Sequence, residues 1–144
     1  MGRLDVASEG LLVVTSDGAL ARAMEHPELG GLSRRYEVVV HGRVTPAKVA
    51  ALRKGLTVNG VRYKGMGVRV TDAREKRATL QLTCREGKNR MIRKLCDHLR
   101  LRVSRLKRTG FGPFKLDALP NANTVLRVPL PRSLRRFLEP PSPG

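Results

Sequence analysis

The alternation of polar and apolar residues over residues 67–71 and 78–84 constrains the fold more than any other feature. A period of two places the apolar side chains on one face of a strand. A short charged link, residues 72–77, separates the two runs. Two such strands joined in this way form an antiparallel pair in which each strand buries one face. An antiparallel sheet is therefore expected.

Other segments carry further signals for secondary structure. Asn59-Gly60 suits a two-residue hairpin, because both central positions of a type I′ turn need a positive φ. Thr45 and Pro46 indicate a helix start, and Gly55 indicates its end. Strands are also expected over residues 10–15, 34–44, 101–107 and 125–128, and helices over 19–25 and 88–99. Because strands outnumber helices and hairpin links dominate, the predicted class is α+β, with a mixed, mostly antiparallel sheet flanked by helices.

Positive charge is the strongest compositional signal. Lys and Arg number 29 against 12 Asp and Glu, a formal net charge of +17. Such an excess repels itself in a compact fold, whereas each phosphate that it neutralises releases counterions and favours binding. A membrane surface would attract the same charge, but no segment has the pattern of a basic amphipathic helix with bulky aromatic residues. A nucleic acid is therefore the expected partner, and no membrane contact is expected.

The two cysteines and three histidines lack the spacing of a metal site. Cys84 and Cys96 form no C-x-x-C pair, and they match no zinc pattern with His26, His41 and His98. Two buried, reduced thiols are predicted, and the histidines are assigned no function. No signal peptide pattern opens the sequence, and no apolar stretch approaches the roughly 18 residues of a membrane span. A cytoplasmic location is expected.

Three motifs carry the functional signal. Residues 2–5 read G-R-L-D, residues 34–38 read R-R-Y-E-V, and residues 85–95 read R-E-G-K-N-R-M-I-R-K-L. In this order and spacing they resemble the pseudouridine synthases that modify ribosomal RNA, of the ribosomal small subunit pseudouridine synthase A (RsuA) family. One such motif alone is weak evidence, but three in series over nearly the whole chain are specific.

The resemblance implies that a uridine in ribosomal RNA is isomerised to pseudouridine without a cofactor or a metal. The bond between uracil and ribose breaks, the uracil turns, and carbon 5 of the base is joined to the sugar. The implied fold is a pseudouridine synthase-like catalytic domain over residues 1–130, followed by a basic, Pro-rich tail over residues 131–144. The implied partner is 16S or 23S rRNA or a pre-ribosomal particle, and the protein is expected to be a monomer.

The resemblance also assigns roles to individual residues. Asp5 is the implied catalytic carboxylate, Arg93 its basic partner, and Tyr36 the residue that stacks on the target base. A carboxylate that acts at neutral pH has to stay ionised although partly desolvated, and an adjacent arginine favours the charged form. An aromatic face can hold a base that has been turned out of its stack.

Arg3, Lys88 and Arg90 are the expected RNA contacts. Arg3 is implied to touch the RNA or the space that the base vacates. Lys88 and Arg90 stand in a glycine-led turn at an expected helix start, where backbone amides favour a phosphate. Lys88 and Arg90 are equally compatible with a solvated surface.

Each residue of the implied site also has an ordinary structural interpretation. Asp5 fits a surface acid paired with Arg3, and Tyr36 fits a core residue with a hydrated hydroxyl. Arg93 fits a surface partner of Asp97, one helical turn further on. The corresponding alternative function is a non-catalytic RNA-binding or ribosome-assembly protein derived from this fold. Retention of Asp5, Tyr36 and Arg93 together favours the enzyme, because binding alone needs no acid among so many basic residues.

The chain begins directly at the G-R-L-D motif. Family members carry a preceding first strand of the catalytic sheet, and often a small RNA-binding domain before it. Without that strand, one edge of the sheet is expected to stay open and the loop of Asp5 is expected to be less fixed.

Overall fold

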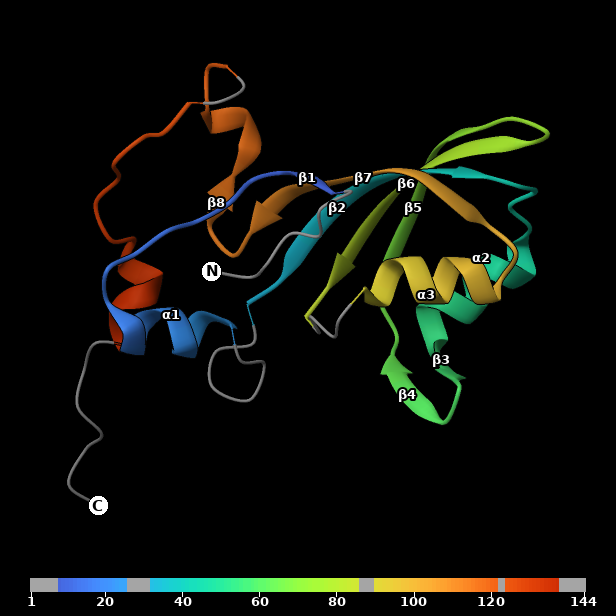
Figure 1. Cartoon of the computed structure of the whole chain (residues 1–144), viewed down its shortest axis with the longest axis horizontal. Coiled ribbons are helices and arrows are strands. Elements are labelled where there is room, and N and C mark those ends of the chain that lie inside the picture. Colours follow the sequence, from blue (N-terminus) through green and yellow to red (C-terminus); the bar gives the residue numbers. More distant parts are fainter. Residues whose placement is uncertain (1–7, 26–31, 86–89, 122–123, 138–144) are drawn as a thin grey trace.

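A six-stranded mixed sheet forms the centre of the structure (Figure 1). The computed structural model describes residues 8–25, 32–85, 90–121 and 124–137. The strand order is β1-β7-β2-β6-β5, with β8 paired to the end of β7; β1 runs parallel to β7, and the other pairs are antiparallel. The predicted α+β class is thereby confirmed. The strands are β1 Glu9–Gly10, β2 Arg34–His41, β5 Gly67–Ala73, β6 Arg77–Cys84, β7 Arg102–Phe111 and β8 Phe114–Lys115.

The hairpin predicted from alternation is formed by β5 and β6. On β6 the buried residues are Ala78, Leu80, Leu82 and Cys84, whereas Gln81 and its polar neighbours point to the other face. β5 follows the pattern less closely, since it lies at the edge of the sheet and its pairing shifts by one residue after Val70. The period of two therefore predicted which face of β6 is buried.

A second, two-stranded sheet consists of β3 (Gly55–Val58) and β4 (Val61–Lys64). Asn59 and Gly60 join the two strands with φ angles of 49° and 79°. Both values are positive, as a type I′ turn requires. The predicted hairpin is confirmed.

The helices begin and end close to the predicted positions. The hydroxyl of Thr45 accepts a hydrogen bond from the Lys48 amide at 3.3 Å, Pro46 opens α2, and Gly55 closes it with a φ of 101°. The cap signals thus set both ends of α2. The helices are α1 Gly18–Glu25, α2 Pro46–Lys54, α3 Met91–His98 and the 3₁₀ segments η1 Leu116–Ala118 and η2 Arg132–Phe137.

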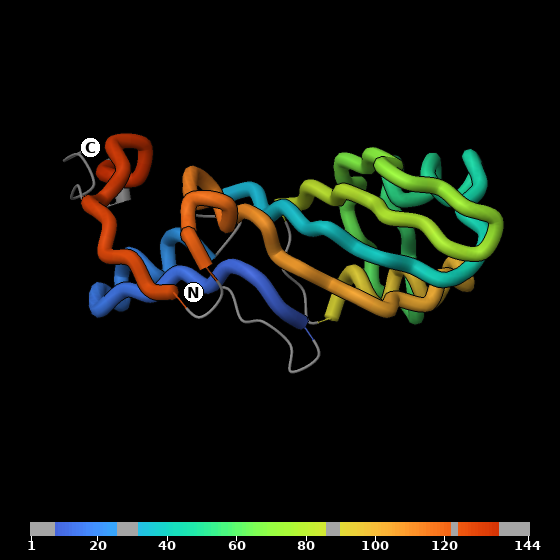
Figure 2. The backbone as a smooth tube through the Cα atoms, turned by 90° about the horizontal axis from the view of Figure 1, so that it is seen from above, coloured from blue at the N-terminus to red at the C-terminus, as the bar shows by residue number. Residues whose placement is uncertain are grey.

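Two hydrophobic clusters lie along the sheet. The first joins the inner faces of β2 and β6 to α2 and α3, with residues such as Val38, Leu80 and Leu95. The second packs α1 and η2 against the end of β7, through residues such as Met24 and Phe111. Figures 1 and 2 show the resulting elongated molecule, with α1 and η2 at one end and α2, α3 and the β3–β4 hairpin at the other. β7 contributes Leu106 to the first cluster and Phe111 to the second, so it connects the two ends of the molecule.

The strand predicted over residues 10–15 is wrong in extent and burial. Only Glu9 and Gly10 form β1, and the exposed fractions of Leu12 and Val14 are 53% and 80%. A strand needs a neighbour for its amides and carbonyls. In the described part of the chain, β7 supplies that neighbour only as far as Leu11, whose amide donates to the Arg108 carbonyl at 2.8 Å.

The strand predicted around residues 125–128 is also wrong. Val125, Leu126 and Val128 are 93%, 49% and 53% exposed, and the segment has no regular structure. Apolar residues in a short run carry no information on whether a partner strand is available. The chain instead returns to the core through Leu134 of η2, which is 1% exposed in the second cluster.

Both cysteines are buried and free, as predicted. Burial raises the pKa of the Cys96 thiol from its ordinary value of 9.0 to about 12. The folded protein therefore keeps this proton at pH values where the unfolded chain loses it. The contribution of the protonated Cys96 thiol to the free energy of unfolding is complete below pH 9 and is lost as the pH rises from 9 toward 12.

Cys96→Ala is expected to lower the free energy of unfolding at pH 7 by about 1 kcal/mol, because it leaves a small cavity. Above pH 9 the wild type loses up to about 1.4 kcal/mol per pH unit through Cys96, and the variant does not. Urea unfolding at pH 7, 9 and 10 measures this difference. A gap between the two proteins that stays constant from pH 7 to pH 10 would contradict the prediction.

Candidate active site

Tyr36 lies in the middle of the sheet and packs against the first cluster. On β2 it is paired with Leu82 of β6 and Arg108 of β7. Its side chain is half-buried against the first cluster. Burial raises the pKa of the Tyr36 hydroxyl, whereas the charges of Arg108 and Arg34 and a hydrogen bond from Arg108 lower it. Tyr36 is thus neutral at physiological pH, and its ring is held on one side by the sheet.

Arg93 joins α3 to the N-terminal segment. Its side chain is half-buried, and Nη2 donates to the Ser8 Oγ at a distance of 3.5 Å. Asp5 lies shortly before Ser8 in the sequence but outside the described residues. Arg93 is therefore directed toward the segment that follows the G-R-L-D motif, and it is not a fully solvated charge on the outer face of α3.

Arg90 stands at the start of α3 with its side chain exposed. Its φ is 52°, a left-handed conformation that non-glycine residues seldom adopt. The exposed guanidinium is available to a ligand that approaches this end of the helix. The other two expected RNA contacts, Arg3 and Lys88, lie outside the described residues.

The N-terminal segment lies against β7 at a glycine. Gly10 is paired with Arg108 and has a φ of 113°. A side chain at this position would overlap the backbone of Arg108. Glycine therefore permits the close approach by which Leu11 bonds to β7.

The sequence did not predict that two arginines near Tyr36, Arg34 and Arg108, are buried. Arg34 and Arg108 are 4% and 1% exposed, and their guanidinium carbons lie 5.1 and 5.2 Å from the centre of the Phe111 ring. We term Arg34, Phe111 and Arg108 the arginine–phenylalanine stack. Arg34 donates to the carbonyls of Arg85 and Glu25 at 2.9 and 2.8 Å. Burying a cation costs free energy unless it is hydrogen-bonded. Because moving the chain around this stack would break those hydrogen bonds and the contacts with the ring, the stack holds the surrounding chain in place.

Arg108 links three parts of the molecule. Its Nε donates to the Leu11 carbonyl at 2.9 Å, its side chain bonds to Tyr36, and it stacks on Phe111. Burial lowers the pKa of its guanidinium, although Tyr36 opposes this effect. A sequence signal existed: in the alternation of the strand after residue 101, residue 108 shares a face with the inward-pointing Leu106. Arginine at that position was not expected to point inward.

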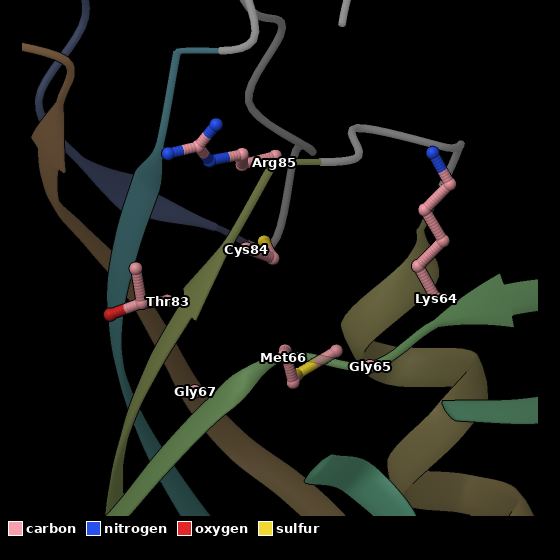
Figure 3. Close-up of a pocket in the computed structure, with 7 residues that line it drawn as sticks. All are labelled: Lys64, Gly65, Met66, Gly67, Thr83, Cys84 and Arg85. Atoms are coloured by element: carbon pink, nitrogen blue, oxygen red, sulfur yellow. The ribbon is translucent and has the colours of Figure 1, made fainter. Parts of the chain in front are cut away.

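A pocket of about 320 Å³ opens at the ends of β4 and β6 (Figure 3). Lys64 is the last residue of β4 and Arg85 follows β6, and Met66 and Cys84 also line the pocket. The remaining lining residues are Gly65, Gly67 and Thr83. The described lining has two cations and a hydroxyl but no carboxylate or histidine. It suits an anionic or polar ligand and offers no acid–base pair of its own.

Within the described residues, no cluster of three or more side chains of the metal-binding types is found. Of the helices in that part of the chain, none has the length and apolar character to cross a membrane.

The fold agrees with comparisons to known proteins. A family model described as RNA pseudouridylate synthase matches residues 1–98. The chain therefore belongs to the RNA pseudouridylate synthase family.

Its relatives include an uncharacterized RNA pseudouridine synthase of Rickettsia bellii, 39% identical over 122 residues that make up 84% of this chain and 52% of the relative. Ribosomal large subunit pseudouridine synthase B of Haemophilus influenzae is 36% identical over 81% of this chain and 32% of its own length. A crystal structure of a pseudouridylate synthase superimposes with a TM-score of 0.74 at 26% identity, over 81% of this chain and 50% of that one. The chain spans about half the length, or less, of these relatives.

Proposed function

We propose that the chain forms the catalytic part of an enzyme that isomerises uridine to pseudouridine in ribosomal RNA. The observation that carries the proposal is the contact between Arg93 and Ser8, because it brings the third motif to the segment that follows the first. Tyr36, from the second motif, lies on β2 of the sheet that also contains β1, the strand directly after Ser8. Membership of the family supports the same conclusion.

The substrate is proposed from charge and from the relatives. A net charge of +17 favours a polyanion, and a folded RNA supplies the phosphates. The Haemophilus relative is named a ribosomal enzyme. The exposed Arg90, together with Arg3 and Lys88, would hold the RNA backbone around the target.

Asp5 is the proposed catalytic carboxylate. It acts either as a nucleophile that attacks the ribose or the uracil, or as a general base that removes a proton from the ribose. Arg93 keeps it ionised, because a neighbouring cation stabilises the charged form of a carboxyl group. Tyr36 stacks on the extruded uracil with the open side of its ring. No cofactor or metal enters this mechanism.

The finer assignments belong to the same proposal. The three motifs favour the ribosomal small subunit pseudouridine synthase A (RsuA) type within the family. Residues 1–130 would form the catalytic domain and residues 131–144 the basic tail. The enzyme is proposed to be a cytoplasmic monomer. Its proposed substrate is 16S or 23S rRNA or a pre-ribosomal particle.

A tritium-release assay tests this function. Forming the new bond at carbon 5 of uracil displaces the hydrogen there, so [5-³H]uridine-labelled rRNA is expected to release tritium when it is incubated with the chain. Labelled 16S and 23S rRNA are tested separately, each with a parallel filter-binding measurement. Tight binding to both RNAs without release from either would overturn the enzyme proposal and favour an RNA-binding or assembly protein.

A further inference from the structure

Arg108 forms a hydrogen bond with the hydroxyl of Tyr36, and the chemistry of arginine fixes the direction of that bond. Arg108 lies directly opposite Tyr36 on β7, and cross-strand neighbours in a sheet stand close enough for their side chains to meet. A hydrogen bond joins the two side chains. A guanidinium has five N–H donors and no acceptor, so the phenolic oxygen of Tyr36 has to be the acceptor. The hydroxyl hydrogen of Tyr36 is thereby directed away from Arg108.

Arg108 is itself fixed from two other sides. Its Nε donates to the Leu11 carbonyl at 2.9 Å, and its guanidinium lies 5.2 Å from the centre of the Phe111 ring. With 1% of its surface exposed, Arg108 has almost no freedom to change rotamer. It is too deeply buried to touch a base or a phosphate of an RNA on the surface.

We propose that Arg108 is a positioning residue, which fixes the ring of Tyr36 and the N-terminal segment relative to each other through their shared guanidinium. The inference rests on the proposed function, in which Tyr36 holds the target base and the N-terminal segment carries Asp5. A misplacement of about 1 Å at a reacting centre can cost on the order of a hundredfold in rate. Arg108 thus holds Tyr36 and Leu11 in a fixed relation without contact to the substrate.

The first measurement reads the contact without any activity. The chain contains two tyrosines, so ¹³Cζ-labelled tyrosine gives two NMR signals, and Tyr36→Phe assigns them. In Arg108→Met the Tyr36 signal is expected to shift at pH 7, and the pKa of Tyr36 is expected to rise, because the guanidinium that favours its ionised form is gone. The signal of Tyr63 serves as the internal reference.

Arg34→Met is the matched control. Arg34 stacks on the same Phe111 ring at 5.1 Å and is also buried, but its hydrogen bonds go to the carbonyls of Arg85 and Glu25. Loss of either arginine is expected to destabilise the fold, as thermal unfolding will show. The charge of Arg34 also lowers the pKa of Tyr36, so Arg34→Met is expected to raise this pKa as well. The Tyr36 signal at pH 7 is expected to change less in Arg34→Met than in Arg108→Met, because only Arg108 contributes both a charge and a hydrogen bond.

The second measurement is single-turnover and steady-state tritium release. In Arg108→Met, kcat is expected to fall by on the order of tenfold to a hundredfold with little change in KM, and Arg108→Lys is expected to recover part of kcat. Arg34→Met is expected to keep kcat within about threefold of the wild type at a temperature where it is folded. Should Arg108→Met fail to fold, Arg108→Lys is compared with Arg34→Lys in both measurements.

The outcomes separate the two proposals. An unchanged Tyr36 signal in a folded Arg108 variant overturns the positioning role, whatever the activity. A shifted signal with an unchanged kcat also overturns it and leaves the proposed function intact. A wild type without tritium release overturns the proposed function, and the positioning role falls with it, even where the NMR shift is seen.

Discussion

Asp5→Asn is expected to abolish tritium release from labelled rRNA, with a loss on the order of 10³-fold or more. The amide has nearly the shape of the carboxylate but can neither attack as a nucleophile nor accept a proton from the sugar. Because the substitution removes one negative charge, it also reduces repulsion from phosphates, so RNA affinity is expected to stay equal or to rise slightly. Tritium release and filter binding, measured on the same preparation, check both statements.

Asp97→Asn provides the control for Asp5→Asn. Asp97 is an exposed acid near the end of α3, and the change removes the same charge with the same atoms. This variant is expected to release tritium at the wild-type rate. Release by Asp5→Asn within tenfold of the wild type would show that the catalytic carboxylate is another residue.

Arg93→Met is expected to lower kcat by about 10²-fold or more at pH 7. Methionine keeps much of the length of the side chain but removes the cation that, in the proposed site, favours an ionised Asp5. The pKa of Asp5 is therefore expected to rise, which moves the acidic limb of the pH–rate profile to higher pH. The loss of activity is thus expected to be larger at pH 5.5 than at pH 8.

Two companion variants define what Arg93 contributes. Arg93→Lys keeps the charge but not the planar fork, so an intermediate kcat is expected. Lys94→Met removes a cation from the next position of α3, where the side chain is exposed, and is expected to affect RNA affinity more than kcat. A pH–rate profile for Arg93→Met that parallels the wild type would contradict the pairing with Asp5.

Local sequence signals predicted much of the fold. The alternation in β6, the Asn59-Gly60 turn and the Thr45 cap each depend on neighbours within a few residues, and the structure has all three. Residues 10–15 and 125–128 were predicted wrongly because strand formation depends on a partner elsewhere in the chain. An apolar run indicates that its side chains favour burial, but it does not indicate whether another strand lies beside it to pair with its backbone.

In the candidate site, too, local motifs predicted some residues, whereas residues that depend on distant partners were missed. The motifs identified Tyr36 and Arg93, and the structure places Arg93 against Ser8. Arg34 and Arg108 were missed because an arginine in a strand is ordinarily expected in solvent. Their burial is decided by a ring and by carbonyl groups that come from distant parts of the sequence. The alternation that places residue 108 on the face of Leu106 does not reveal these partners.

The stretch from Ser8 to Leu11 has a consequence for how this site tolerates change. One end is bonded by Arg93 of α3 and the other by Arg108 of β7, and Gly10 lies pressed against the β7 backbone between them. The number of residues between the two contacts is therefore as much a determinant of the site as any side chain. A single insertion or deletion there would leave every functional group in the sequence and still move Ser8 out of register with Arg93.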